Sequence, residues 1–344
     1  MNKVIVIFMA LFFSWSSVSA AVEPSAWKAF RDHFISPDGR VIDYVNGRIT
    51  TSEGQSYAML VALSVDDRQA FDIIWTWTKN NLQVRSVDSL LAWKWGERLP
   101  GTWDIIDLNN AADADILTAI ALLDAAEKWK DGSYRTEAVS IMKGIRNKLI
   151  IEKWDRLFLL PGYFGFTPDT GPVINPSYLI IPSFKKFAAQ GQKEFWDRLY
   201  ADSLFVLYHS TFGKYNLPAD WITWNQAGPR IDTEKGAVFG YEAIRVVLYL
   251  SWDRNLKVLK GLGPYLDFIE QIGYMPSAVN LSEDTISLHE ASGGFYAVMA
   301  RAAMELGRKE QYASLRAKAG EKISYEKDDY YSNILYLLSD IRVN

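Results

Sequence analysis

Residues 112–129 of the chain read ADADILTAIALLDAAEKW. Apolar side chains recur in this stretch at three- and four-residue intervals, with Ile116, Ile120 and Leu123 among them. This spacing predicts an α-helix, and apolar residues on adjoining faces predict that the helix is buried on most sides. Residues 238–252 form a second such stretch, apolar nearly all round. The chain therefore contains helices of the kind that fill the centre of a large domain.

The same periodicity extends along the whole chain. It predicts twelve helices, near residues 25–34, 53–65, 68–81, 111–129, 134–149, 176–190, 192–209, 234–252, 256–272, 290–306, 308–319 and 329–341. Some are buried, whereas others carry a charged outer face, such as that of Lys309, Glu310 and Arg316. We therefore expect an all-α fold, an α/α barrel of inner and outer helices, with a plain bundle as the alternative. The best short strand candidate is residues 158–166.

The first twenty residues have the pattern of a secretory signal peptide. Lys3 precedes an apolar run over residues 4–13, and the stretch ends in Val18-Ser19-Ala20. The run is shorter than the ~20 residues of a spanning helix. We therefore expect cleavage after Ala20, no membrane anchor afterwards, and a periplasmic or secreted protein. Residues 21–344 contain no Pro/Ser-rich linker, which predicts a single domain.

The composition excludes several classes of function. The net charge is −4 without a basic block, which argues against nucleic acid and anionic lipid as partners. Cysteine is absent, so disulfides, thiolate zinc sites and cysteine nucleophiles are excluded. The three histidines, His33, His209 and His289, lack metal-like spacing. Carboxylates remain as the candidates for chemistry.

Three long connections are rich in aromatic residues, and aromatic faces stack on sugar rings as well as filling cores. They cover residues 81–110, 149–176 and 210–233. Long loops at one end of a barrel would form a binding cleft. The aromatic residues proposed there include Trp93, Trp95, Trp103 and Trp221.

Glu53 lies at the expected start of a helix. Ser52 and Gln55 fit a capping box, which makes Ser52 the expected cap. Glu53 then has two interpretations. It complements the helix dipole, or it is a general acid whose proton is retained through apolar burial or a second carboxylate.

Asp113 and Asp115 share the first turn of the helix at residues 112–129. Residues two apart point about 200° apart, so only one of them can face a central cleft. Asp113 shares its face with Ile116 and Ile120, which makes it the inward candidate. Its charge would raise the pKa of Glu53 if the two approach.

Glu242 lies in the apolar helix predicted over residues 234–252, where an acid requires a partner. Arg245, three residues later, is the nearest candidate. The pair is either purely structural or holds Glu242 ionised as a base. Glycoside hydrolysis needs one protonated acid and one ionised base.

These segments together resemble glycoside hydrolase family 8, especially the bacterial endoglucanases associated with cellulose synthesis. Residues 51–57 (TSEGQSY) resemble the family's proton-donor segment, and residues 112–115 (ADAD) resemble its signature, with Ala112 where Ser or Thr is usual. Residues 175–178 (NPSY) and 220–221 (DW) match further family segments. The base position, usually Asp, is Glu242 here.

The resemblance implies an (α/α)₆ barrel, inversion at the anomeric carbon, and no metal or cofactor. It implies that Glu53 is the general acid, that Asp113 holds the distorted sugar, and that Glu242 is the base. Residues expected to bind substrate are Tyr241, Arg245, Trp93, Trp95, Trp103, Tyr178, Asp220 and Trp221.

The function expected from this resemblance is an endo-1,4-β-glucanase acting on a cellulose chain, with the cellulose synthase complex as a candidate partner. Two alternatives stay open. A xylanase or chitosanase belongs to the same family, and the Glu242 departure leaves room for a glucan-binding export factor with weakened catalysis.

Overall fold

The computed structural model describes residues 21–232 and 234–341. The predicted signal peptide, residues 1–20, lies outside the described residues. The α-helices are α1 Pro24–Phe34, α2 Ser52–Ser64, α3 Arg68–Asn81, α4 Ala112–Trp129, α5 Gly132–Lys148, α6 Ile181–Ala189, α7 Lys193–His209, α8 Ile244–Asp253, α9 Leu256–Leu259, α10 Gly263–Ile272, α11 Gly293–Glu305, α12 Lys309–Ile323 and α13 Tyr330–Leu338. Two 3₁₀ turns are η1 Pro176–Tyr178 and η2 Lys260–Leu262.

Short antiparallel strands connect the helices. They are β1 Thr50–Thr51, β2 Lys94–Leu99, β3 Thr102–Asp107, β4 Ile150–Lys153, β5 Arg156–Leu159, β6 Val173–Ile174, β7 Thr211–Phe212, β8 Leu217–Pro218, β9 Ile222–Asn225, β10 Gly228–Ile231, β11 Val238–Phe239, β12 Val279–Asn280 and β13 Thr285–Ile286. They pair as three three-stranded and two two-stranded sheets.

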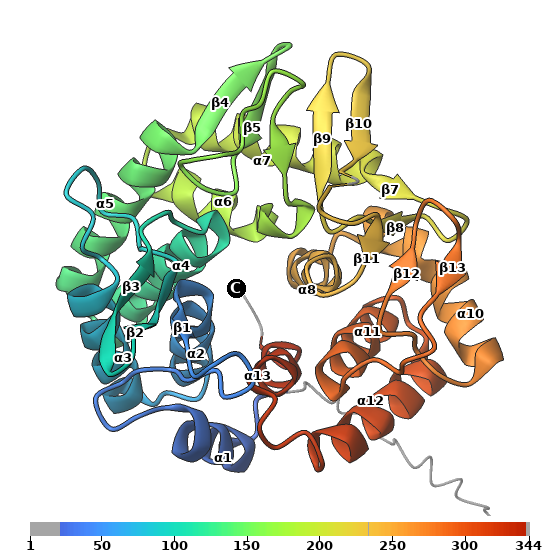
Figure 1. The fold of residues 1–344 in the computed structure, drawn as a ribbon, viewed down its shortest axis with the longest axis horizontal. Coiled ribbons are helices and arrows are strands. Elements are labelled where there is room, and N and C mark those ends of the chain that lie inside the picture. The colour runs from blue at the N-terminus through green and yellow to red at the C-terminus, as the bar shows by residue number, and fades with distance from the viewer. Residues whose placement is uncertain (1–20, 233, 342–344) are drawn as a thin grey trace, which may run out of the picture.

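Six helices contact one another in a closed ring. The order is α2, α4, α6, α8, α11 and α13, and α13 packs back against α2 (Figure 1). A second set lies outside this ring, with α3 on α2, α5 on α4, α7 on α6, α12 on α11 and α1 on α13. The chain thus alternates between inner and outer positions for most of its length.

Burial explains which helices lie inside. In α4 every residue from Ala112 to Leu123 is buried, as the all-round apolar pattern predicted. In α12, by contrast, Ala319 is the one residue buried. An inner helix is covered on all sides, whereas an outer helix buries a single stripe.

Three predicted helices differ in their bounds. The helix expected over residues 176–190 is split into η1 and α6, and that over 256–272 into α9, η2 and α10. The helix expected from residue 234 begins only at Ile244, because residues 238–239 pair with β12 instead. The strand expected over residues 158–166 is observed as β5, Arg156–Leu159, so the two overlap only at residues 158–159. After β5 the chain continues as a loop through Pro161.

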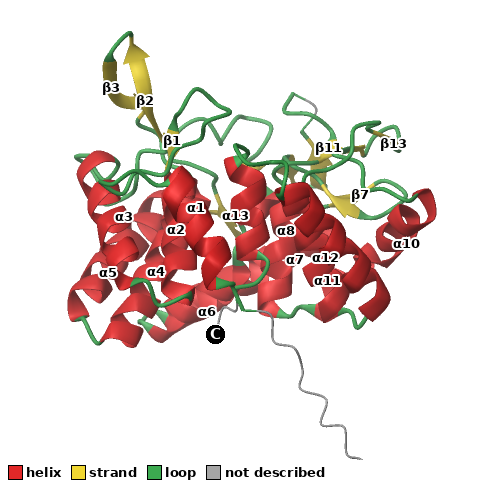
Figure 2. Cartoon of the chain, turned by 90° about the horizontal axis from the view of Figure 1, so that it is seen from below, coloured by secondary structure: helices red, strands yellow, loops and turns green. Residues whose placement is uncertain are grey.

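The strands and long loops gather at one end of the helices. Figure 2 shows β1, β2, β3, β7, β11 and β13 on that side, with the β2–β3 hairpin standing furthest from the helices. The N-termini of α2 and α4 follow directly on these connections. Among the helices of the described residues, none has the length and apolar character needed to cross a membrane.

Candidate active site

Glu53 lies in the first turn of α2 and is partly exposed. The cap differs from the prediction, because Thr51 is the N-cap and its Oγ1 accepts from the Gly54 amide at 3.1 Å. Ser52 is already the first helical residue, and its hydroxyl lies 3.3 Å from Glu53 Oε2. The predicted Ser52–Gln55 capping box is therefore wrong, since the helix starts one residue earlier than such a box requires.

Gln55 has a different task. Its Oε1 accepts from the Val41 amide at 2.6 Å, and its Nε2 donates to Thr78 Oγ1 at 2.8 Å and to the Gly39 carbonyl at 3.1 Å. The side chain is fully buried, so these bonds satisfy an amide that would otherwise be costly. Gln55 ties α2 to α3 and to the loop before β1.

Asp113, Arg245 and Glu242 meet in one cluster, in which only the Glu242 side chain is partly exposed. Arg245 Nη1 donates to Asp113 Oδ2 at 2.6 Å, and Arg245 Nη2 forms an ion pair with Glu242 Oε2. Asp113 is fully buried, and Arg245 is 4% exposed. The predicted pairing of Glu242 with Arg245 is present, and the same guanidinium also holds Asp113, 132 residues earlier.

The environment raises the pKa of two carboxyl groups. Burial is the main cause for Glu53, the negative charge of Asp113 is the second, and together they raise its pKa to about 8. Burial also raises the pKa of Asp113 to about 6, although the Arg245 guanidinium opposes this shift. Near neutral pH, Glu53 is therefore protonated and Asp113 is ionised.

Glu242 lies just before α8, in the turn of residues 240–243, rather than inside a helix. Its Oε2 accepts from Asn175 Nδ2 at 2.9 Å in addition to its contact with Arg245. Within residues 21–232 and 234–341 no hydrogen bond is made to its Oε1. That oxygen is free to accept a proton from a water molecule.

Asp220 supports this turn. Its Oδ1 accepts from the amides of Gly240 and Ala243, both at 2.9 Å. The carboxyl group is nearly buried, and burial followed by the charge of Glu242 raises its pKa to about 6. Asp220 thus lies beside the base candidate, with one oxygen occupied by the backbone that carries it.

Asp115 points away from Asp113, as the helical geometry predicted. It accepts from the Leu91 amide and from Asn110 Nδ2, both at 2.8 Å. Burial raises its pKa to about 8. These bonds anchor the loop that leads into Trp93, whose carbonyl accepts from the Ser52 amide at 2.9 Å. Trp93 is thereby fixed next to Glu53.

The predicted aromatic residues fall into two groups. Tyr178 packs beside Arg245, with the guanidinium 5.5 Å from its ring centre, and Trp221 lies 6.2 Å from the Tyr178 ring. Trp95 and Trp103 instead stack near Arg40, at 4.6 Å and 4.8 Å from its guanidinium carbon. The structure therefore places Trp221 and Tyr178 at the cluster and Trp95 and Trp103 on the β2–β3 hairpin.

Three residues at or beside the cluster were not predicted from the sequence. Tyr57 accepts from Arg245 Nη1 at 2.6 Å, and Asn175 holds Glu242. Tyr331 of α13 donates to the carbonyl of Tyr241 at 2.7 Å, beside the 61% exposed Tyr241 ring. Tyr57 and Asn175 stand within the motifs that were recognised, so their position in those motifs was the available signal. Tyr331 had none.

Two further features complete the description. In the described part of the chain, no group of three or more acidic or histidine side chains is placed to hold a metal ion.

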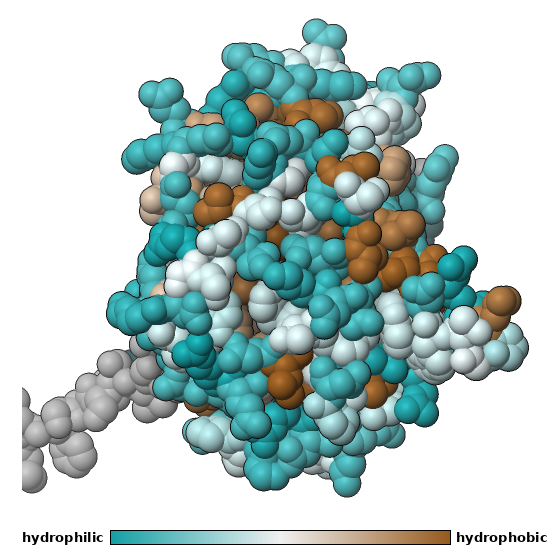
Figure 3. Space-filling model, turned by 90° about the vertical axis from the view of Figure 1, so that its left-hand side faces the viewer, coloured by the Kyte–Doolittle hydropathy of each residue, from teal (hydrophilic) through white to brown (hydrophobic). Residues whose placement is uncertain are grey.

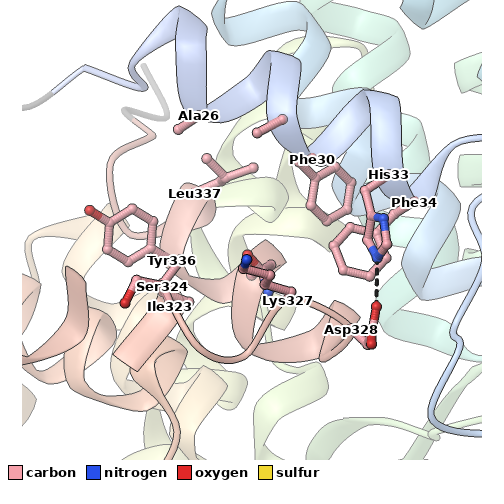
Figure 4. Close-up of a pocket in the computed structure, with 12 residues that line it drawn as sticks. Ala26, Phe30, His33, Phe34, Ile323, Ser324, Lys327, Asp328, Tyr336 and Leu337 are labelled. Carbon is pink, nitrogen blue, oxygen red and sulfur yellow. Dashed lines mark hydrogen bonds and ion pairs between the residues drawn. The ribbon is translucent and has the colours of Figure 1, made fainter. Parts of the chain in front are cut away.

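A cavity of about 500 Å³ lies between α1, α12 and α13, with His33 and Asp328 paired at 2.9 Å on its rim (Figure 4). None of the candidate carboxyl groups lines that cavity.

A carboxyl group protonated near pH 7, close to a second acid held by an arginine and to aromatic rings, is the equipment for cleaving a glycosidic bond. The class defined by this site is a glycoside hydrolase. The chain belongs to glycosyl hydrolases family 8, whose model matches residues 1–342.

Relatives agree with this assignment. An endoglucanase of Cellulomonas uda is 32% identical over 284 residues, covering 82% of this chain and 78% of that protein. A probable endoglucanase of Novacetimonas hansenii is 31% identical, covering 94% of this chain and 93% of that protein. The crystal structure of an endoglucanase from Klebsiella pneumoniae, a family 8 glycosyl hydrolase, has a TM-score of 0.80 at 32% identity and covers 92% of this chain and 97% of that one.

Proposed function

We propose that the protein is an inverting endo-1,4-β-glucanase that cuts internal bonds of a cellulose chain. The observation that supports the proposal is the contrast between the surroundings of Glu53 and those of Glu242. Burial and Asp113 raise the pKa of Glu53 to about 8, whereas Glu242 is ion-paired with Arg245. A proton donor and an ion-paired carboxylate are the two groups that glycoside hydrolysis needs, and inversion is what the resemblance to family 8 implies.

In this mechanism Glu53 donates its proton to the glycosidic oxygen as the bond to the anomeric carbon breaks. Glu242 Oε1 accepts a proton from water while the water oxygen attacks that carbon from the opposite face. Asp113, fully buried in this structure, helps through its charge to keep the proton on Glu53, and the resemblance to family 8 implies that it holds the distorted sugar. Arg245, Asn175 and Asp220 hold the base in place.

Substrate binding is assigned to the aromatic and polar side chains around the cluster. Trp93, Trp221 and Tyr241 offer rings for stacking on sugars, which pair apolar ring faces with polar rims. Tyr178, predicted as a further binding residue, is only 8% exposed and lies beside Trp221. Trp95 and Trp103 lie further out on the hairpin. The endoglucanases of Cellulomonas uda and Klebsiella pneumoniae and the probable endoglucanase of Novacetimonas hansenii support β-glucan as the substrate class.

The proposal extends to architecture and location. The closed ring of six helices with outer helices packed on it supports an (α/α)₆ barrel formed by residues 21–344 as one catalytic domain. The pattern of residues 1–20 supports export and a periplasmic or secreted enzyme. The cellulose synthase complex is the partner proposed for an enzyme that trims nascent cellulose.

A substrate panel tests the function. The mature protein is incubated with carboxymethyl-cellulose, xylan and chitosan, and the anomer released is followed by NMR. Fast release from carboxymethyl-cellulose with an α-anomeric product supports the proposal. Preference for xylan or chitosan would reassign the substrate within the family, and binding without turnover would favour the export factor.

A further inference from the structure

A polar and aromatic pocket lies on the outer side of the ring, between the loop at residues 36–40, α3 and β2. Its volume is about 490 Å³, and its lining consists of Ser36, Asp38, Arg40, Thr76, Trp77, Asn80, Asn81 and Trp95. None of these residues comes from an inner helix, and none is a candidate carboxyl group of the catalytic cluster. Figure 3 shows the side of the molecule that α3 and α5 cover, where apolar side chains lie scattered between polar ones.

The walls of this pocket are fixed in the fold. Gln55 reaches from α2 to the Gly39 carbonyl and to Thr78 of α3. Gly39 has φ +98°, and a Cβ at this position would lie 2.2 Å from the Ile73 carbonyl oxygen, so only glycine lets the loop lie this close to α3. A ligand would therefore meet a pre-formed surface, which lowers the ordering cost of binding.

The lining chemistry fits a sugar. The aromatic part of the lining is the partly exposed Trp95 ring, which stands edge-on to the largely buried Trp77 ring with the ring centres 5.3 Å apart. The Arg40 guanidinium lies 4.6 Å from the Trp95 ring centre. The Asp38 carboxylate and the Asn80 amide add acceptors and donors at the rim. One carboxylate balances one guanidinium, so the pocket favours a neutral ligand with many hydroxyl groups over a phosphate or an ammonium compound.

We propose that this pocket is a second glucan-binding site, separate from the catalytic cleft, and the identity of its ligand as a β-glucan rests on the proposed function. Trp95 then binds sugar in this pocket and not beside Glu53. Holding one segment of a polymer while the cleft acts on another makes the second binding event intramolecular, which raises overall retention on cellulose without altering the catalytic groups.

The test compares Asn80→Arg with Asn147→Arg. Both asparagines are exposed in the last turn of an outer helix, so neither change should disturb folding, but only Asn80 lines the pocket. Retention of the full chain on regenerated cellulose is measured at low temperature, together with hydrolysis rates on cellotetraose and on regenerated cellulose. Asp38→Ala serves as a second pocket variant.

We expect Asn80→Arg to reduce retention by at least about tenfold and to slow cellulose hydrolysis, while its rate on cellotetraose stays that of the wild type. Asn147→Arg should match the wild type in every assay. Unchanged retention in both pocket variants overturns the inference, as does an equal loss on cellotetraose and cellulose. If the wild type hydrolyses neither substrate, the proposed function fails, but retention still tests the pocket because it needs no turnover.

Discussion

Arg245 and Asp113 form a buried ion pair, with Nη1 2.6 Å from Oδ2, that joins the first turns of α8 and α4. The second amino group of the same guanidinium holds Glu242. Removing one partner of such a buried pair leaves an uncompensated charge. The packing of two inner helices and the charge of the catalytic cluster therefore depend on one side chain.

Glu53→Gln should abolish turnover while leaving the fold and glucan binding intact. The amide keeps the shape of the side chain but has no proton to transfer, and positioned proton transfer accounts for roughly 10²–10⁴-fold in rate. The measurements are kcat on cellotetraose, circular dichroism and affinity for the same sugar. Activity near that of the wild type would remove Glu53 from the role of acid.

Asp113→Asn should shift the pH profile. Glu53 acts in its protonated form, so activity is lost as pH rises through its pKa of about 8. The charge of Asp113 contributes to that raised pKa. The neutral amide lowers the pKa of Glu53, and the alkaline limb of kcat/KM therefore moves to lower pH. We also expect kcat near neutral pH to fall by roughly tenfold or more, because less of Glu53 then keeps the proton that it must donate. An unchanged limb and rate would contradict this role.

Glu242→Ala should remove activity by roughly 10²–10⁴-fold, because no group remains to take the proton from water. Glu242→Asp should keep a measurable part. The product from a β-linked chain should be the α-anomer, since an inverting pair stands ~6.5–9.5 Å apart with water between. A β-anomeric product would indicate the ~5–5.5 Å separation of a retaining pair, and a fully active alanine variant would exclude Glu242 as base.

Asp220→Ala should lower both kcat and stability. The Gly240 and Ala243 amides would lose their acceptor, at about 1–3 kcal/mol for each buried donor left unsatisfied. Asp220→Asn keeps one acceptor oxygen and should restore most of both. Rates on cellotetraose and urea denaturation distinguish the two variants. If Asp220→Asn is as inactive as Glu242→Ala, then Asp220 itself is the base.

Trp93→Ala and Trp221→Ala should weaken binding of cello-oligosaccharides. Loss of one stacked ring costs about 1 kcal/mol, or roughly fivefold in Kd. Trp154→Ala is the matched control, because this exposed indole lies in the turn between β4 and β5. Calorimetric titration with cellotetraose supplies the affinities. If the two variants lose stability but keep affinity, the rings belong to the core.

The parts of the fold that could be predicted are those with a strong local pattern. The inner helix α4 is apolar on all faces. The same pattern predicted that Asp113 faces the centre of the ring and that Asp115 points away from it. The β2–β3 hairpin was missed for the opposite reason. Most of its residues are exposed and only residues 94–96 and 105 are partly or fully buried, so no sustained alternation of apolar and polar residues marks the strands.

Contacts between distant segments explain the other differences. The expected helix over residues 234–252 starts late because Asp220 captures the amides of Gly240 and Ala243 in a turn. The pairing of Arg245 with Glu242 could be predicted because the two residues are three positions apart. The bond between Arg245 and Asp113 could not, because 132 residues separate them in the sequence. The family motifs pointed to the candidate acids. The contacts that Asn175, Tyr57 and Tyr331 make around them could be seen only in the three-dimensional structure.

The closure of the ring has a consequence for synthesis. Helix α13, residues 330–338, fills the last gap between α11 and α2, and Tyr331 at its start reaches the carbonyl of Tyr241. A growing polypeptide therefore lacks one wall of the inner ring until α13 itself has been synthesised. A truncation that removes α13 opens the ring and leaves the carbonyl of Tyr241 without the Tyr331 hydroxyl that donates to it.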